Sequence, residues 1–263
     1  MNLNEKAVII LGGLGGIGKA ICKCLNQNGV KKLAIIDILN EDCAVAIFKF
    51  LDISSSELNL IYKKCCVTDK DLLNQHMSEI KSEFGSLDIV INAAGIANEI
   101  DPEKLIAVNF HGTVNSSLTA INLMRKDMNK SSNGGTIINI ASVAALRPVF
   151  FLPIYSGTKH AILGFTRSLI DDAFYNRTGI KFIVICPGAT RTPIVGKEHV
   201  IDKFLFPEML DQVKKLSKEM KFQEPEIVAK CILTALEDNE NGSVWQCENS
   251  RMEKLNIYNY NEF

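Results

Sequence analysis

Tyr155 and Lys159 are the two residues in this sequence whose types and spacing most directly indicate chemistry. They stand four positions apart, so on a helix their side chains lie on one face. A free phenol has a pKa of about 10 and is a poor base at neutral pH. A neighbouring ammonium group favours the phenolate and lowers that pKa. The spacing therefore predicts a tyrosine that takes a proton from an alcohol, or returns it, while a hydride moves.

Ser142 gives this pair a context. It precedes the tyrosine by thirteen residues and follows a predicted strand, where its hydroxyl can hold a substrate oxygen against the phenol. Asn92 and Pro187 also stand at the ends of predicted strands. Ligands of parallel α/β sheets bind beyond the carboxyl ends of the strands, so all three residues are expected at one functional edge. Without that context, a tyrosine and a lysine on a helix are ordinary surface residues.

A glycine-rich run follows the first apolar strand and opens the first helix, with the sequence Gly12-Gly13-Leu14-Gly15-Gly16-Ile17-Gly18. Glycines let the backbone turn tightly and approach a pyrophosphate, and the helix N-terminus offers it free N–H groups and a positive dipole end. Such a run also fits a plain tight turn. The strand before it and the helix after it favour a dinucleotide site.

Asp37 closes the second predicted strand, nineteen residues after Gly18. A carboxylate there accepts hydrogen bonds from the adenosine ribose hydroxyls and repels a 2′-phosphate. No Arg or Lys stands in the glycine-rich run or at Ile38 to compensate that charge. The sequence therefore predicts NAD rather than NADP as the cofactor, the alternative being a solvated aspartate at a strand end.

Apolar runs of strand length alternate with helical patterns along most of the chain. Strands are predicted at about 6–12, 32–37, 59–66, 87–93, 135–141, 180–186 and 243–247, and helices at about 16–28, 40–50, 69–84, 102–128, 153–176 and 225–238. The strands are continuous hydrophobic runs, which is typical of strands covered by helices on both faces. The alternation predicts an α/β single-domain Rossmann fold, a doubly wound parallel sheet of about seven strands.

Composition limits the function classes. The chain has 263 residues, of which 47% are hydrophobic, so one domain over 1–263 with a sizeable core is expected. Its 29 basic and 30 acidic residues give a formal charge of −1, which provides no general field for nucleic acid or an anionic membrane. The eight cysteines are scattered without a CxxC pair, and the start lacks a signal peptide. These features favour a cytoplasmic protein with reduced thiols and no metal site.

Two segments interrupt the alternation. Residues 188–224 show neither a clear strand nor a single helix, which favours a lid over the substrate, or else a helical insert that caps the core. Residues 248–263 are expected to form a C-terminal tail.

Several apolar residues are candidates to line a substrate pocket, or equally to pack in the core or a subunit contact: Phe150, Phe151, Leu152, Ile194, Val195, Phe204, Leu205 and Phe206. They favour a hydrophobic secondary or isoprenoid alcohol as substrate. Arg147 either meets a substrate anion or is a solvated loop residue.

Together these motifs resemble the short-chain dehydrogenase/reductase family over residues 5 to about 247, with insect alcohol dehydrogenases and 15-hydroxyprostaglandin dehydrogenase-like members as the nearest branches. The matching residues are Gly12, Gly16 and Gly18, Asn92-Ala93-Ala94-Gly95, Asn109, Ser142, Tyr155, Lys159 and Pro187-Gly188. Several motifs in a fixed order are more specific than any one of them.

The resemblance implies a catalytic tetrad. Ser142 positions the substrate oxygen, Tyr155 is the general acid and base, and Lys159 binds the nicotinamide ribose and tunes Tyr155. Asn109 supports a water through a helix irregularity. The resemblance also implies a small-molecule alcohol or ketone as the substrate, and a homodimer or homotetramer that pairs through the helices expected at 102–128 and 153–176.

The resemblance further implies which residues hold NAD. Asn92 and Val67 line the adenosine side, and Thr190 and Thr192 lie near the nicotinamide amide. The other residues expected to contact the cofactor, in addition to the glycine-rich run and Asp37, are Cys66, Ala93, Ala94, Tyr155, Lys159, Pro187 and Gly188.

The chain departs from the family pattern at two positions near the cofactor. Leu11 replaces the usual threonine before the glycine-rich run, and Cys66 stands near the end of the third strand where an aspartate is usual. A thiol accepts hydrogen bonds poorly, so weaker NAD binding is expected. This change also keeps open a cofactor-binding or storage protein on the same fold. A sugar-nucleotide epimerase or a zinc alcohol dehydrogenase fits less well, given the chain length, the glycine spacing and the lack of a Cys/His cluster.

Overall fold

The strands form one continuous layer. The computed structural model describes residues 2–53, 58–128, 132–195 and 205–257. In these parts of the chain, eight strands form one sheet in the order β3-β2-β1-β4-β5-β6-β7-β8, parallel except for the antiparallel pair β7 and β8. The strands are β1 (Ala7–Leu11), β2 (Lys32–Asp37), β3 (Asn59–Lys64), β4 (Ile89–Asn92), β5 (Gly135–Ile140), β6 (Ile180–Pro187), β7 (Val244–Glu248) and β8 (Arg251–Leu255). The predicted single-domain Rossmann fold is confirmed.

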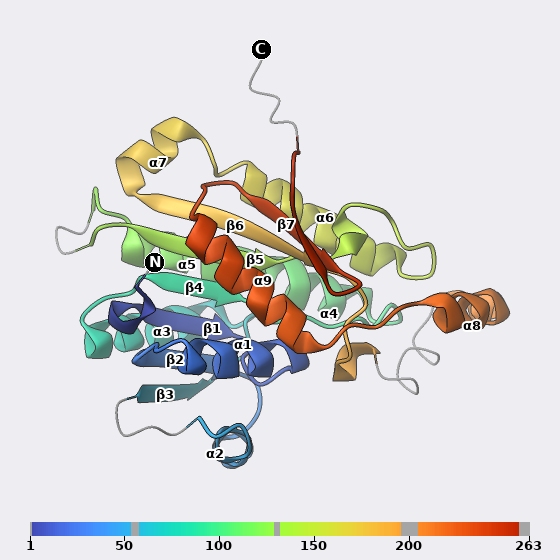
Figure 1. Ribbon diagram of the computed structural model, residues 1–263, viewed down its shortest axis with the longest axis horizontal. Coiled ribbons are helices and arrows are strands. Elements are labelled where there is room, and N and C mark those ends of the chain that lie inside the picture. The colour runs from blue at the N-terminus through green and yellow to red at the C-terminus, as the bar shows by residue number, and fades with distance from the viewer. Residues whose placement is uncertain (1, 54–57, 129–131, 196–204, 258–263) are drawn as a thin grey trace.

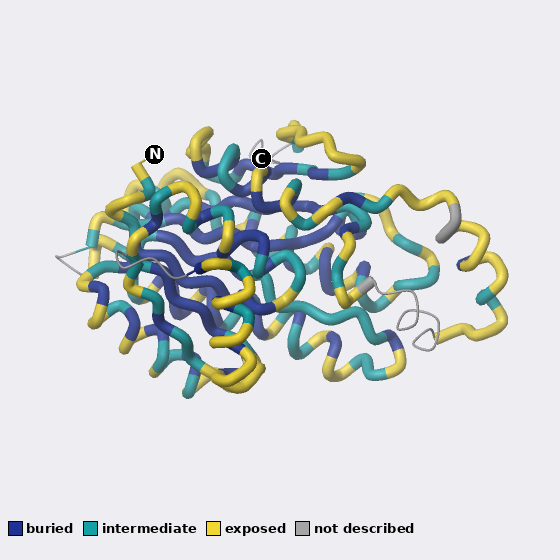
Figure 2. The backbone as a smooth tube through the Cα atoms, turned by 60° about the horizontal axis from the view of Figure 1, so that its bottom comes forward, coloured by how far each residue is buried: buried dark blue, intermediate teal, exposed yellow. Residues whose placement is uncertain are grey.

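Helices cover both faces of the sheet (Figure 1). Apolar residues of α1 (Gly16–Gln27), α2 (Glu41–Phe50) and α9 (Pro225–Asp238) pack on one face. On the other lie α3 (Lys70–Phe84), α5 (Gly112–Met124) and α6 (Pro153–Arg167). All five residues of β1 are fully buried, which explains its unbroken apolar sequence. Figure 2 shows the strands as the buried layer between more exposed helices.

Two long helices expected from the sequence are interrupted. The segment expected over 102–128 consists of α4 (Pro102–Ile106), a π-helical stretch η2 (Ala107–His111) and α5. The single helix expected over 153–176 is instead two helices: α6 ends at Arg167, and α7 (Asp172–Thr178) follows it. The Asp171 carboxylate accepts hydrogen bonds from the Ala173 and Phe174 N–H groups, so this side chain caps the start of a separate helix.

The C-terminal segment also differs from the expectation. Residues 251–255, assigned to a tail, form the antiparallel edge strand β8. This strand is mostly exposed and has a polar sequence, so it lacks the apolar run that predicted the others. The rest of the expected tail, from residue 258, lies outside the described residues.

Within the expected lid at 188–224, residues 196–204 lie outside the described residues. The remainder contains the short turns η4 (Pro193–Val195) and η6 (Pro207–Met209) and the helix α8 (Leu210–Glu219). In Figures 1 and 2 the segment that carries α8 projects from the body of the protein. Among the helices that the structure describes, none has the length and apolarity needed to cross a membrane.

Candidate active site

The glycine-rich loop is folded tightly against the end of β4. Gly12 has φ 75°, and a Cβ there would lie 2.6 Å from the Ala94 Cα. A Cβ on Gly18 would overlap the Gly12 carbonyl oxygen. Gly15 is the N-cap of α1 and makes no side-chain cap bond, so the first N–H groups of the helix are left for an anion. This cradle fits a pyrophosphate, as the sequence predicts.

The tight packing around Gly12 leads us to expect an effect of its substitution on stability. Gly12→Ala should lower the free energy of unfolding by about 2–4 kcal/mol, since the left-handed conformation and the backbone overlap are both unfavourable for alanine. Gly164→Ala is the matched control: it lies in α6, and an added Cβ would have no neighbour within 4 Å. The control should stabilise by about 0.5–1 kcal/mol. Urea unfolding measures both, and equal midpoints for the two variants would contradict this account of the loop.

Other residues of the run serve the packing of the loop. Leu14 is buried, and Ile17 packs against the apolar layer below α1. Gly16 faces the segment after β6, where a Cβ would lie 2.6 Å from the Thr192 Cγ2. The glycine-rich loop and the loop after β6 are therefore in direct contact across the site.

Asp37 lies against the same loop. Its carboxylate accepts hydrogen bonds from the Leu14 N–H at 2.9 Å and the Ile38 N–H at 2.8 Å. The Tyr62 hydroxyl donates to the carbonyls of Asp37 and Leu39 at 3.3 and 2.5 Å, and burial raises the pKa of Tyr62 to about 12. These contacts fix the Asp37 carboxylate at the end of β2, beside the first turn of the glycine-rich loop.

The residues expected on the adenosine side separate into two groups. Cys66 is exposed, with its sulfur 3.0 Å from the Thr68 Oγ1, and Val67 is buried against Gly112. Asn92 instead turns inward. Its amide nitrogen donates to the Asn139 Oδ1 at 2.7 Å, because the strand register places these two asparagines side by side.

Both the nitrogen and the oxygen of the Asn92 side-chain amide form hydrogen bonds inside the protein. Its nitrogen also donates to the Ser117 Oγ at 3.1 Å, and its oxygen accepts from the Ser116 Oγ at 2.6 Å. The side chain of Asn92 is therefore not presented at the edge of the sheet. At that edge the backbone continues through Ala93, whose N–H donates to the Leu11 carbonyl at 2.9 Å, and Ala94.

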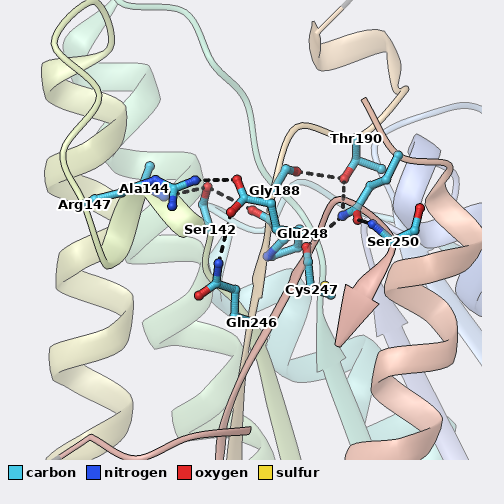
Figure 3. A network of polar contacts seen from close by, with 11 residues as sticks. Ser142, Ala144, Arg147, Gly188, Thr190, Gln246, Cys247, Glu248 and Ser250 are labelled. Carbon is cyan, nitrogen blue, oxygen red and sulfur yellow. Dashed lines mark hydrogen bonds and ion pairs between the residues drawn. The ribbon is translucent and has the colours of Figure 1, made fainter. Parts of the chain in front are cut away.

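The loop after β6 is tied down on two sides. The Gly188 N–H donates to the Cys247 carbonyl at 2.8 Å, and the Thr190 hydroxyl donates to the Gly188 carbonyl at 2.9 Å. Gln223, which the sequence did not single out, is buried and donates to the Thr190 Oγ1 and the Cys247 carbonyl at 3.3 and 2.8 Å. Figure 3 shows Thr190 within this network. The Thr192 hydroxyl in turn donates to the Thr190 carbonyl at 3.3 Å, and Thr192 lies against Gly16 of the glycine-rich loop.

Ser142, Tyr155 and Lys159 meet between β5, β6 and α6. Ser142 is buried, lies close enough to the Tyr155 side chain to lower its pKa, and donates its hydroxyl to the Pro187 carbonyl oxygen at 3.4 Å. The Lys159 Nζ lies 5.5 Å from the centre of the Tyr155 ring and donates to the Ile140 carbonyl at 3.0 Å. The structure thus brings together the three residues that the sequence assigned to proton transfer.

Burial dominates the electrostatics of this group. It raises the pKa of Tyr155, against a smaller lowering by the hydrogen bond from Ser142. It also lowers the pKa of Lys159 to about 8. The direction for Tyr155 is opposite to that expected from the Tyr–Lys pair alone, because desolvation of the phenolate outweighs the other effects. Both pKa shifts favour the neutral form of the side chain over its charged form, for the phenol and for the amine.

Asn109 lies in the π-helical stretch η2 and is fully buried. Its Oδ1 accepts from the Ile96 N–H at 2.8 Å, and its Nδ2 donates to the Ile96 carbonyl at 3.0 Å and the Thr158 Oγ1 at 3.2 Å. The helix irregularity expected around this residue is present. Through these bonds Asn109 joins the loop after β4 to the helix that carries Tyr155.

Arg147 is an exposed loop residue, as one of its two expected roles requires. It forms an ion pair with Glu248 at the end of β7, and the Gln246 amide donates to the same carboxylate at 3.0 Å (Figure 3). This pair closes the loop after Ser142 against the end of the sheet.

Apolar side chains gather beside that loop. Phe150 and Phe151 pack edge to face at 5.2 Å between ring centres, and together with Phe206, Met209 and Val213 they border a hollow of about 350 Å³. Among the other candidates, Ile194 and Leu205 are exposed, Leu152 precedes α6, and Phe204 and the side chain of Val195 lie outside the described residues. Within the described residues, no three His, Cys, Asp or Glu side chains converge as they would around a metal ion.

Comparisons with known proteins agree with this geometry. The family model described as short chain dehydrogenase matches residues 6–200. Alcohol dehydrogenase 1 of Ceratitis cosyra is 34% identical over 97% of this chain and 96% of its own length. The 15-hydroxyprostaglandin dehydrogenase [NAD(+)] of Rattus norvegicus is 32% identical over 95% and 94%. The crystal structure of levodione reductase superposes with a TM-score of 0.79 at 23% identity, covering 94% of this chain and 97% of that one.

Proposed function

The chain belongs to the short-chain dehydrogenase family, and from this premise we propose that it is an NAD-dependent oxidoreductase that interconverts an alcohol and its carbonyl compound. The observation that carries the proposal is the meeting of Ser142, Tyr155 and Lys159, with the Lys159 Nζ near Gly95 in the loop after β4 against which Gly12 also packs. Two relatives named as dehydrogenases, of alcohols and of 15-hydroxyprostaglandin, support the reaction class.

Each side chain of the site has its own role in the proposed reaction. Ser142 lies beside Tyr155, so a substrate oxygen that contacts both hydroxyls is held in one place. Tyr155 takes the alcohol proton or returns it, and Lys159 provides a nearby charge that favours the phenolate. Asn109 holds the helix that carries both residues. NAD, when bound, supplies the acceptor of the hydride, with its pyrophosphate in the glycine cradle and its adenosine ribose at Asp37.

Asp37 should decide the choice between NAD and NADP. Asp37→Asn keeps the shape of the side chain but removes the charge that accepts from ribose hydroxyls and repels a 2′-phosphate. We expect the ratio of kcat/KM for NAD⁺ over NADP⁺ to fall at least about tenfold, since a hydrogen bond to a charged group contributes about 1.5–3 kcal/mol.

The matched control is Asp42→Asn, which removes an exposed carboxylate from the first turn of α2. It should leave the ratio unchanged. Initial rates of NADH and NADPH formation measure both variants, and an equal ratio for wild type and Asp37→Asn would exclude Asp37 as the selector.

For the substrate we propose a hydrophobic secondary or isoprenoid alcohol. Support comes from the apolar hollow of Phe150, Phe151 and Phe206, which borders the segment between Ser142 and Tyr155. In this proposal the protein is a single domain, and residues 188–224 act as a lid over the bound substrate. A screen with NAD⁺ in which only short polar sugars reacted would overturn this substrate class.

We further propose a cytoplasmic homodimer or homotetramer. The likeness to the family supports the assembly, and the free state of all eight cysteines supports a reducing compartment. A monomer at micromolar concentration in sedimentation would contradict the assembly.

The alternative is a protein that binds a cofactor on the same fold without turnover. The exposed Cys66, at a position where the family usually has aspartate, is the feature that favours it. NAD⁺ binding without NADH formation from any alcohol would favour this alternative.

A further inference from the structure

Glu99 lies in the loop between β4 and α4 and is fully buried. Its carboxylate oxygens accept hydrogen bonds from the Ile154 N–H at 3.0 Å and the Tyr155 N–H at 2.8 Å. Both amides belong to the first turn of α6, which starts at Pro153. The contact therefore joins a buried carboxylate directly to the backbone of the tyrosine that faces Ser142.

These bonds replace a local cap. The N-cap residue of α6 is Leu152, whose side chain cannot accept a hydrogen bond, so the first amides of the helix need another partner. Burying a carboxylate is costly unless its oxygens are hydrogen-bonded. The two amides and the positive end of the helix dipole offset that cost. A neutral side chain without two acceptor oxygens leaves at least one buried amide unpaired.

The same loop is held at its other end by Asn109, which bonds to both backbone groups of Ile96 and to the Thr158 hydroxyl of α6. The loop is thus fastened between the π-helical stretch and the start of α6. Any shift of Glu99 moves the Tyr155 backbone relative to Ser142, which stands on a different element.

We propose that Glu99 is the positioning residue for Tyr155: it holds the amide of Tyr155, and with it the phenol, in place against Ser142 and Lys159. This inference rests on the proposed function. A residue with this role affects the chemical step more than cofactor binding, because the glycine-rich loop and Asp37 lie on other elements.

Three variants test the inference. Glu99→Gln keeps the size but turns an NH2 group toward one of the two amides. Glu99→Asp keeps both acceptor oxygens on a shorter side chain. Glu103→Gln is the matched control, since Glu103 is an exposed glutamate on the neighbouring helix α4. Each is assayed with NAD⁺ and cyclohexanol, a simple apolar secondary alcohol, and by hydrogen exchange of the amides of residues 154 and 155.

We expect Glu99→Gln to lower kcat at least about tenfold while the KM for NAD⁺ changes less than about twofold, and to accelerate exchange of the two amides. Glu99→Asp should recover part of the lost kcat, and Glu103→Gln should match the wild type. Unchanged kcat with accelerated exchange would show a cap without a role in positioning and would overturn the inference. So would unchanged exchange, or equal losses in kcat and in NAD⁺ binding for both Glu99 variants.

Failure of the proposed function has a different signature. Wild-type protein would then form no NADH with cyclohexanol or any other alcohol. The exchange measurement would still decide whether Glu99 holds the Tyr155 amide.

Discussion

Tyr155→Phe is expected to lower kcat for NAD-dependent alcohol oxidation by about 10³-fold, within the range of about 10²–10⁴ that positioned acid–base groups contribute. The substitution removes the phenolic oxygen beside Ser142 and leaves the ring in place. The affinity for NAD⁺ should change less than about threefold, because the glycine-rich loop and Asp37 are untouched. Initial rates of NADH formation and calorimetric titration with NAD⁺ measure the two effects.

Tyr175→Phe is the control for this substitution. Tyr175 lies on α7, where its ring faces the Lys181 Nζ at 5.6 Å, away from the site. It should retain wild-type kcat. Activity that survives in Tyr155→Phe would contradict a proton transfer through the phenol.

Lys159→Met is expected to abolish turnover and at the same time to stabilise the protein at pH 7. Lys159 is only 4% exposed, and burial lowers its pKa from 10.5 to about 8. A shift of that size corresponds to about 3 kcal/mol of destabilisation when the lysine is charged in both states. Methionine removes the buried charge but also the charged hydrogen bond to the Ile140 carbonyl, worth about 1.5–3 kcal/mol. The net gain at pH 7 should be about 0.5–1.5 kcal/mol.

The pH dependence of that gain has a definite sign. Below a pH of about 8 the lysine is protonated in both states, so the cost of burying its charge is constant. Between about 8 and 10.5 the unfolded chain binds more protons than the folded protein, so the stability of the wild type rises with pH. The advantage of Lys159→Met should therefore shrink between pH 7 and pH 10.

Urea unfolding at both pH values measures the effect, with Lys23→Met as the control, since Lys23 is exposed on α1. A Lys159→Met variant that is less stable than wild type at pH 7, or an advantage that is constant with pH, would show that the lysine is not buried as a charge.

The sequence predicted the central sheet well because buried parallel strands need continuous apolar runs. It missed β8, whose edge position lets it be polar, as in Arg251-Met252-Glu253-Lys254. The break between α6 and α7 depends on one capping carboxylate, Asp171. Neither feature alters hydrophobic periodicity, the signal on which the prediction rested.

The residues of the site also separate into those that local sequence signals predict and those that depend on the tertiary fold. Ser142, Tyr155 and Lys159 were predicted because their spacing and their places at strand and helix ends are local signals, and Asn109 was predicted from the resemblance to the family. The inward turn of Asn92 depends on the register that sets Asn139 beside it, a tertiary fact. Glu99 looks no different in sequence from the exposed Glu103 four residues later. Only the fold shows which of the two meets α6.

Direct detection of hydride transfer decides whether the protein is an NAD-dependent alcohol dehydrogenase. NAD⁺ is incubated with wild-type protein and a panel of apolar secondary alcohols that carry deuterium on the carbinol carbon, and the reduced cofactor is analysed by mass spectrometry. We expect NADH that carries one deuterium from at least one of these alcohols, together with the matching ketone, and no such product from Tyr155→Phe. NAD⁺ that binds but acquires deuterium from no alcohol in the panel would contradict this expectation.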